Sequence, residues 1–459
     1  MDNKSKEILL LVFIGIIVTI VGVYGIFGKF LLSDGGLYLY RDNVWSLYGD
    51  ISGRLSFSAV NSLQGGFNPY LRAIPSGISH LFLDQILTFS GVRFTGIAIE
   101  KIFFTVLVFL NVNCMLFVSY FLLRKHYSFE SSLIGSIFAS FLYTFNPTAI
   151  MHINWSLHWM AYILLPLVFY FSHKLITDKQ LKYAVLLGIL VAFVGVEPHW
   201  LFFYSFLITI YIIFNLRANR KSILRILCLF LASILVFLGI SSCIILPSLS
   251  YSLAQGLLSP SYVVTSELVD TYSKHADIIN TIRFLGKTGY QPGDWDIIAG
   301  EGAPSSAVFP YWLVATFSIP LIAFMSVLLN RRKRVVLFFS TVFILSIILA
   351  CGTKLLGVAY YALVNLPMGW IFRVPTKWLW ISVFSSSILV CFSISAIYVS
   401  LSKYRRIVIP VLLGIIILVS LSSWQLFTGN ASGITEPVYP PIKDIDSVDR
   451  FLKAENSPY

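Results

Sequence analysis

Three aspartates in one polar stretch are the first residues of this sequence that could do chemistry. Asp34, Asp42 and Asp50 lie among glycines and aromatic residues within residues 32–70, directly after an apolar N-terminal segment. A carboxylate held near a hydroxyl can accept its proton as a general base. Asp42 is the first candidate because it is near enough to the apolar segment to return to it. Asp34 and Asp50 are the alternatives, and a solvated loop carboxylate is the competing interpretation for each.

Two basic residues late in the chain could bind an anion. Arg373 and Lys377 belong to the sequence FRVPTKW, just before another apolar segment. A guanidinium is always charged and can donate two parallel hydrogen bonds to the oxygens of one phosphate. A lysine one helical turn further on could add another contact. The competing interpretation is that both side chains extend to lipid headgroups, as basic residues at the ends of membrane spans do.

A third group of side chains could bind an acceptor or a metal ion. Glu197 and His199 flank a proline in a tight turn, and Glu267 lies in a long polar segment. The histidine spacing matches no zinc pattern, and residues 32–97 contain no Asp-x-Asp pair. A requirement for Mg²⁺ or Mn²⁺ therefore stays open. A capped turn is the competing interpretation for Glu197 and His199.

Apolar segments must position all of these residues. The sequence is 57% hydrophobic and 12% charged, with a mean hydropathy of +0.82, whereas a soluble domain carries about 25% charged residues. A membrane-crossing helix needs about 20 mostly apolar residues. We therefore predict an all-α polytopic membrane protein with about eleven transmembrane helices. The predicted spans are residues 8–31, 98–123, 131–146, 155–175, 182–197, 199–215, 224–246, 309–329, 335–352, 376–400 and 407–426.

The excess of basic over acidic residues lies on one side of these spans, which the net charge of +12 alone does not show. They gather at the N-terminus and in every second turn, at Arg124-Lys125, Arg217 to Arg225, Arg331 to Arg334 and Lys403 to Arg406. The positive-inside rule places such turns in the cytoplasm. We therefore predict a multi-pass protein of the cell membrane with a cytoplasmic N-terminus and an extracytoplasmic C-terminus. The basic runs are topology signals, and no nucleic-acid partner is expected.

The spans define one transmembrane domain, residues 1–426, with two large outer loops at residues 32–97 and 247–308. Within the first loop, residues 71–96 are expected to lie in the outer membrane interface as an amphipathic segment, and an irregular loop is the alternative. Residues 427–459 form an extracytoplasmic segment that we expect to be the truncated start of an outer domain.

The spans hold few ionisable residues at their centres, which argues against ion-coupled transport but leaves a lipid flippase open. The polar groups gather on the outer side instead. An outer cleft beside lipid suits a substrate with a polar head and a lipid tail.

This arrangement resembles the GT-C fold glycosyltransferases. The motifs YTFNP at residues 143–147, LLPL at 164–167 and FRVPTK at 372–377 look like those of YfhO-type and arabinofuranosyltransferase-like membrane proteins of archaea and bacteria. The resemblance covers most of the chain. It implies sugar transfer from a polyprenyl-phosphate donor to a glycan, lipid or protein acceptor outside the cytoplasm. Arg373 and Lys377 would then bind the donor phosphate, and Asp42 would deprotonate the acceptor. The alternatives are a non-catalytic transporter or flippase of lipid-linked glycans and a scaffold for glycan assembly.

Overall fold

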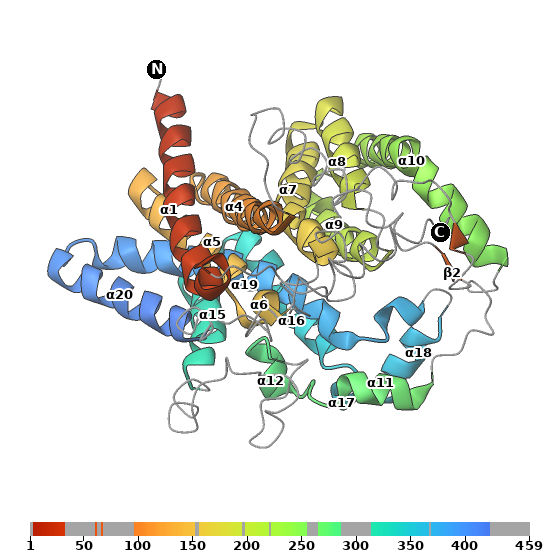
Figure 1. Cartoon of the computed structure of the whole chain (residues 1–459). Coiled ribbons are helices and arrows are strands. Elements are labelled where there is room, and N and C mark those ends of the chain that lie inside the picture. Colours follow the sequence, from red (N-terminus) through yellow and green to blue (C-terminus); the bar gives the residue numbers. More distant parts are fainter. Residues whose placement is uncertain are drawn as a thin grey trace.

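The computed structural model of the chain is built almost entirely of helices (Figure 1). It describes residues 3–32, 60–61, 66–67, 96–151, 156–194, 198–219, 222–254, 265–285, 314–366 and 369–422. Within these ranges, five helices are both long and apolar enough to cross a membrane, and five shorter apolar helices accompany them. The expectation of an all-α protein with membrane-spanning helices is confirmed at this level.

Each predicted span overlaps one long helix of the described chain. These helices are α1 (Asn3–Leu32), α4 (Gly96–Leu123), α5 (Phe129–Thr144), α7 (Ser156–Asp178), α8 (Leu181–Val194), α9 (Pro198–Asn219), α10 (Ile223–Ala254), α15 (Ser318–Asn330), α16 (Arg334–Ala350), α19 (Leu379–Leu401) and α20 (Arg405–Ser422). The agreement has a simple cause. In an apolar segment with few polar side chains, a helix is the conformation that satisfies the backbone groups locally.

Short elements connect the long helices. They are α6 (Pro147–Met151), α11 (Ser266–Ser273), α12 (Ile278–Ile282), α17 (Thr353–Leu356), α18 (Val358–Val364), and the 3₁₀ helices η3 (Gly369–Phe372) and η4 (Pro375–Trp378). Two antiparallel strands of two residues each, β1 (Val60–Asn61) and β2 (Gly66–Phe67), pair Val60 with Phe67. Most of these connectors lie in the second half of the chain, between α10 and α19.

Two prolines that follow the ends of predicted spans behave differently. The third predicted span does stop before Pro147, because α5 ends at Thr144 and the proline opens α6. By contrast, α10 continues through Pro247 to Ala254, so the segment predicted as the second outer loop begins in a helix. A proline removes one backbone hydrogen bond of a helix. In a membrane protein, neighbouring groups can satisfy the freed carbonyl, so the helix runs on.

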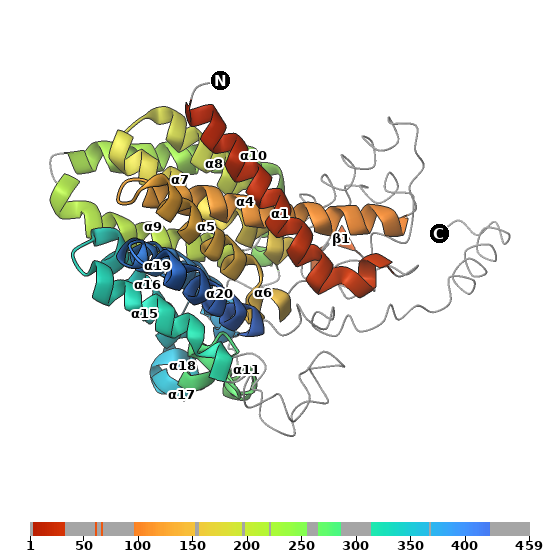
Figure 2. The same ribbon diagram turned by 90° about the vertical axis from the view of Figure 1, so that its left-hand side faces the viewer.

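The helix α19 lies at the centre of the bundle. In Figure 2 it runs among α5, α15, α16 and α20, and it packs against all four. Every residue from Leu379 to Ser395 is buried. A helix that is apolar on all sides is expected to be buried, and the FRVPTKW motif leads directly into this buried helix.

Small residues let α5 and α19 approach closely. A Cβ atom added to Gly135 of α5 would lie 2.6 Å from the backbone oxygen of Cys391. Ser395 Oγ donates a hydrogen bond to Ser131 O across the same interface (2.8 Å). Within α19, Ser385 Oγ donates to Ile381 O (2.7 Å), which satisfies the hydroxyl inside its own helix. Small and hydroxylated residues at such contacts are typical of helices packed in membranes.

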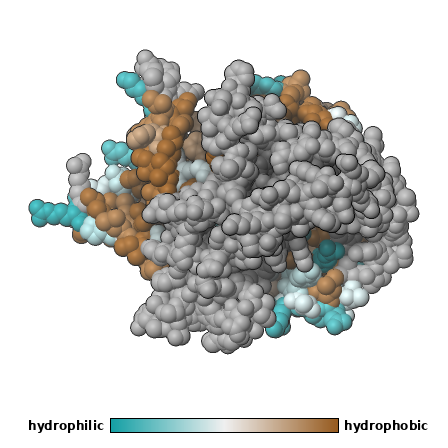
Figure 3. Space-filling model, viewed as in Figure 1, coloured by the Kyte–Doolittle hydropathy of each residue, from teal (hydrophilic) through white to brown (hydrophobic). Residues whose placement is uncertain are grey.

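The helix α1 presents an apolar face outward. Leu9, Phe13, Ile17 and Ile20 are exposed, and Figure 3 shows a column of hydrophobic side chains along this helix. The opposite face contacts the bundle, where Gly22 lies against the ring of Phe145. Surrounding lipid is the natural cover for the exposed face, because a contiguous apolar surface in water is unfavourable.

Candidate functional site

The bundle has two chemically different ends. At one end, the turns that carry the basic residues contact one another and the neighbouring helix ends. The contacts are Arg124 with Glu7 (3.3 Å), Tyr127 with Asn330 (2.6 Å), Tyr398 with Glu130 (3.0 Å) and Arg225 with Lys179 (3.1 Å). We call this the basic-turn end. Turns that the charge pattern assigned to one side of the membrane thus lie together in space.

The candidate cations Arg373 and Lys377 lie at the other end. The last turns of α19 reach the basic-turn end through Tyr398, whereas η4 adjoins the first residue of α19. Tyr398 lies 19 residues after the first residue of α19, which separates these two points by about 29 Å at the rise of an α-helix. Arg373 and Lys377 are both half-buried. Lys377 sits on η4, and Arg373 lies in the bend between η3 and η4, which leads into the central helix.

Aromatic rings line the segment that carries the two cations. Phe372 stacks on Trp378 with ring centroids 5.5 Å apart, and Phe202 of α9 meets Phe372 edge-on at 4.4 Å. Phe203 packs on Trp378 at 5.0 Å. The Tyr360 hydroxyl of α18 donates to Phe372 O (2.7 Å), which holds the end of η3. The two cations are therefore next in sequence to a cluster of rings from three separate parts of the chain, in which Phe203, Phe372 and Trp378 are buried and Phe202 is exposed.

A glycine with positive φ lets this segment pack onto the end of α16. Gly352 has a φ of +53°, and an added Cβ would lie 2.7 Å from Pro375 Cγ and 2.8 Å from Ser273 Oγ. Gly357 has a similar φ of +51°, but an added Cβ there meets nothing within 4 Å. Both glycines have a positive φ, but only Gly352 packs closely against Pro375 of η4.

We predict that Gly352→Ala destabilises the protein more than Gly357→Ala. Each change places a side chain in the left-handed region, which costs about 1–2 kcal/mol. Only Gly352→Ala also pushes against the η4 proline, and such overpacking typically costs about 1–3 kcal/mol more. Thermal unfolding of the purified variants measures the difference. Equal losses at both positions would contradict a packing role for Gly352.

The helix α11 brings Glu267 next to this segment, because α11 packs against η4. Glu267 is exposed in the first turn of α11. The Thr265 hydroxyl caps this helix by accepting from the backbone N–H of Leu268 (3.4 Å). A carboxylate in the first turn also stabilises a helix through its dipole. Glu267 therefore lies on an element that packs against η4, and it also has a structural role.

Asp270, also on α11, makes a contact that sequence reasoning missed. Thr353 Oγ1 donates to Asp270 Oδ1 (2.9 Å) across 83 residues of sequence. Hydrogen bonds from Tyr361 and Thr353 lower the pKa of the Asp270 carboxyl. A general base works best with a pKa near the operating pH, so Asp270 is better suited to anchor α11 on α17 and α18. No local sequence pattern announces a contact of this separation.

A second missed residue is Arg283, a buried cation near the same end. It is 5% exposed, and its guanidinium donates to Asn280 Oδ1 (2.7 Å) and Ile279 O (3.0 Å). It also lies over the ring of Phe317, 4.9 Å from the centroid. Burial lowers the pKa of Arg283, and the charge of Asp277 opposes this effect. The two hydrogen bonds are to residues of α12, whereas the ring contact reaches Phe317, just before α15, so Arg283 links the chain after α12 to the start of α15.

His199 is placed by the structure, and Glu197 lies outside the described residues. His199 is 4% exposed and lies against the rings of Trp200 (6.0 Å) and Phe203 (5.9 Å). This burial among aromatic rings favours a packing role over direct contact with an acceptor. Within the described ranges there is no group of three His, Cys, Asp or Glu side chains arranged to hold a metal ion.

Several predicted features fall outside the described residues. They are Asp34, Asp42 and Asp50, the proposed interfacial segment 71–96, and the C-terminal segment 427–459. Their assignments remain predictions. The sequence argument for the aspartates is unchanged.

The YTFNP motif is architectural. Tyr143 and Tyr162 stack with centroids 4.1 Å apart, and each hydroxyl donates to the backbone oxygen of the other residue (2.5 and 2.7 Å). Asn146 Nδ2 donates to Tyr143 O (2.8 Å), and its Oδ1 accepts from Ala149 N (2.9 Å). One side chain therefore caps the end of α5 and the start of α6. These buried groups connect α5 to α7.

Comparison with known proteins assigns no family. No protein-family model matches the chain, and no curated protein is similar enough to count as a relative. Any assignment of function rests on the chain's own motifs and on where the fold places them.

Proposed function

We propose that this protein is a membrane glycosyltransferase that takes a sugar from a polyprenyl-phosphate donor. One observation carries the proposal: Arg373 and Lys377 are half-buried at the end of an apolar helix bundle, next in sequence to Phe372 and Trp378, whose rings pack with the exposed Phe202. A polyprenyl-phosphate sugar has a charged phosphate joined to a long apolar chain. A site for it needs fixed positive charge next to surface that tolerates hydrocarbon.

The same proposal includes a topology. The eleven long helices each cross the cell membrane, with the basic-turn end in the cytoplasm and the η3–η4 segment at the outer surface. Residues 32–97 and the second outer loop then lie on the same side as Arg373, in a GT-C-like arrangement. Residues 427–459 follow the last span on that side.

The proposed reaction breaks the bond between the anomeric carbon and the phosphate oxygen. A new bond forms between that carbon and the acceptor hydroxyl oxygen, and the hydroxyl proton passes to a carboxylate. The phosphate leaves as a stable anion with the bonding electrons, held by Arg373 and Lys377. Asp42 is the proposed base, with Asp34 and Asp50 as replacements. Glu267 and Glu197 are proposed to bind the acceptor, which is a glycan, lipid or protein.

The test is sugar transfer in isolated membranes. A panel of radiolabelled polyprenyl-phosphate sugars is supplied to membranes containing the wild-type protein, the Asp42→Asn variant or an Asp178→Asn control. Asp178 is a carboxylate at the basic-turn end, paired with Lys174 (3.2 Å). We expect transfer by the wild type and the control, and loss of transfer in Asp42→Asn at equal protein level.

The outcomes separate the site from the function. Transfer that persists in Asp42→Asn and disappears in Asp34→Asn or Asp50→Asn moves the base within the loop. No transfer by the wild-type protein with any donor would contradict the enzyme and favour a flippase or scaffold.

A further inference from the structure

Two turns meet at the basic-turn end and are joined by neutral groups. The Tyr127 hydroxyl, in the turn between α4 and α5, donates to Asn330 Oδ1 at the end of α15 (2.6 Å). Asn330 Nδ2 donates in turn to Phe392 O of α19 (3.4 Å). These contacts fix the turn of residues 124–128 against the turn that contains Lys333.

Lys125 is held in place by a neutral histidine. Its Nζ lies 2.7 Å from His173 Nε2, and His173 Nδ1 lies 2.5 Å from the Tyr211 hydroxyl. An ammonium group only donates hydrogen bonds, so Nε2 must accept, and the ring proton must sit on Nδ1. His173 is therefore the neutral tautomer. In this arrangement the Lys125 ammonium group has two further N–H groups to offer.

Lys333 is held in place by aromatic rings. Its Nζ lies 3.8 Å from the centroid of the Tyr127 ring and 5.5 Å from that of Phe392. The ring of His126 lies on the same Phe392, 5.8 Å away. A cation over a ring face is attracted to it, but no opposite charge is supplied. Lys125, His126 and Lys333 form what we call the turn cluster.

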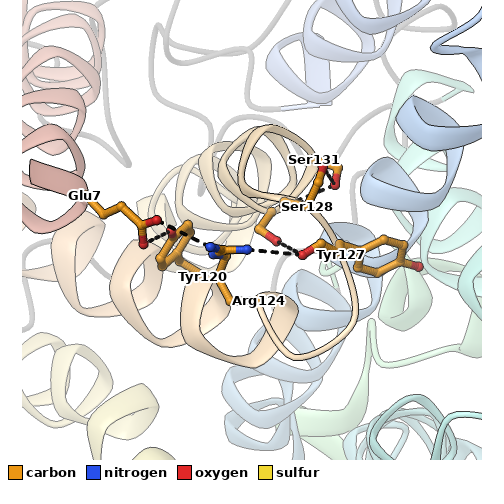
Figure 4. Close-up of polar contacts among 7 residues, drawn as sticks. Glu7, Tyr120, Arg124, Tyr127, Ser128 and Ser131 are labelled. Carbon is orange, nitrogen blue, oxygen red and sulfur yellow. Dashed lines mark hydrogen bonds and ion pairs between the residues drawn. The ribbon is translucent and has the colours of Figure 1, made fainter. Parts of the chain in front are cut away.

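The carboxylates described at this end are engaged elsewhere. Figure 4 shows Glu7 between the Tyr120 hydroxyl (2.6 Å) and the Arg124 guanidinium (3.3 Å). Glu130 accepts from Tyr398 (3.0 Å). Arg124 therefore has a carboxylate partner, whereas the lysines of the turn cluster are held by neutral groups.

Asp178 reduces the charge of the cluster only in part. It accepts from Lys174 (3.2 Å) and offsets some of the repulsion that Lys125 feels from that lysine. Burial and then Lys174 lower the pKa of Lys125 despite Asp178. Burial, followed by the charges of Lys333 and Lys125, lowers the pKa of His126. The positive charges at this place thus repel one another without full compensation.

We propose that the turn cluster binds the phosphate group of an anionic lipid headgroup. Lys125 and His126 are exposed and Lys333 is half-buried, so each of the three side chains has surface that a headgroup can contact. The cluster lies where helices end, and basic pockets between membrane helices recognise such lipids. Because the two ammonium groups are already positioned, little ordering is needed when the anion binds. This inference does not depend on the proposed sugar transfer.

The test compares thermal unfolding of the full chain in lipid nanodiscs. We expect phosphatidylglycerol to raise the melting temperature of the wild type by about 3 °C relative to phosphatidylcholine alone, as a ligand specific to the folded state does. The double variant Lys125→Gln, Lys333→Gln should lose more than half of this shift. Glutamine can still donate to His173, so the local hydrogen bond is kept. Phosphatidylglycerol molecules retained per protein, counted by native mass spectrometry, give a second readout if the double variant unfolds early.

The matched control is Arg331→Gln, Arg332→Gln, which removes two exposed positive charges from the same turn. It should keep most of the shift. An equal loss in the control, or no loss in the lysine variant, would overturn the proposal in favour of general charge attraction. Inorganic phosphate added to phosphatidylcholine nanodiscs separates the two sources of the anion. A lysine-dependent shift with inorganic phosphate alone would overturn the headgroup assignment, and its absence would support it.

Discussion

Replacing Arg373 with alanine is expected to lower sugar transfer by about 100-fold or more, the loss seen when one fixed donor to a developing negative charge is removed. The phosphate gains charge as its bond to the sugar breaks, so the guanidinium contributes most in the transition state. Arg373→Lys should retain an intermediate rate, because it keeps the charge and loses the paired donors. The measurement is kcat/KM for the donor that is active in the membrane assay.

The control for this prediction is Arg331→Ala, which makes the same chemical change at the basic-turn end and should leave transfer unchanged. Thermal unfolding of each variant checks that the fold is intact. If Arg373→Ala transfers sugar at nearly the wild-type rate, the arginine serves only to anchor the segment to lipid headgroups, and the phosphate site lies elsewhere.

Replacing Gly135 with alanine is expected to destabilise the protein by about 2–3 kcal/mol, although alanine is the better helix former by about 1 kcal/mol. The added methyl group would lie 2.6 Å from the backbone oxygen of Cys391 and would also collide with Ser395 Oγ. A backbone oxygen cannot turn away as a flexible side chain can. The helices α5 and α19 would have to separate, and the buried centre of the bundle would loosen.

Gly414→Ala in α20 is the control, because an added Cβ there meets nothing within 4 Å. It should leave the melting temperature unchanged or raise it slightly. The readout for both variants is the thermal transition in one detergent, followed by size-exclusion chromatography. A Gly135→Ala variant as stable as the control would show that α5 and α19 are less tightly packed than their contacts indicate.

The sequence by itself determined the helices and their grouping. The apolar segments predicted a span at each long helix, and most of the predicted ends lie within a few residues of the helix ends. The reason is that an apolar backbone can satisfy its hydrogen bonds locally only as a helix. Charge in the turns grouped Arg124 and Arg225 on one side, and the structure places both at the basic-turn end. The predicted span 131–146 ends close to the end of α5 at Thr144, since the break depends only on Pro147 and the residues just before it.

Only the tertiary structure decided which helix is central and what surrounds the candidate cations. Hydropathy cannot distinguish the buried α19 from the outward-facing α1, because both are apolar and lipid is as apolar as a protein core. The contact of Asp270 with Thr353 and the aromatic rings beside Arg373 join segments far apart in sequence. The helix α10 can continue through Pro247 only if another group bonds to the backbone carbonyl that the proline leaves without its N–H partner. These features are set by packing between distant segments, and packing has no local sequence period.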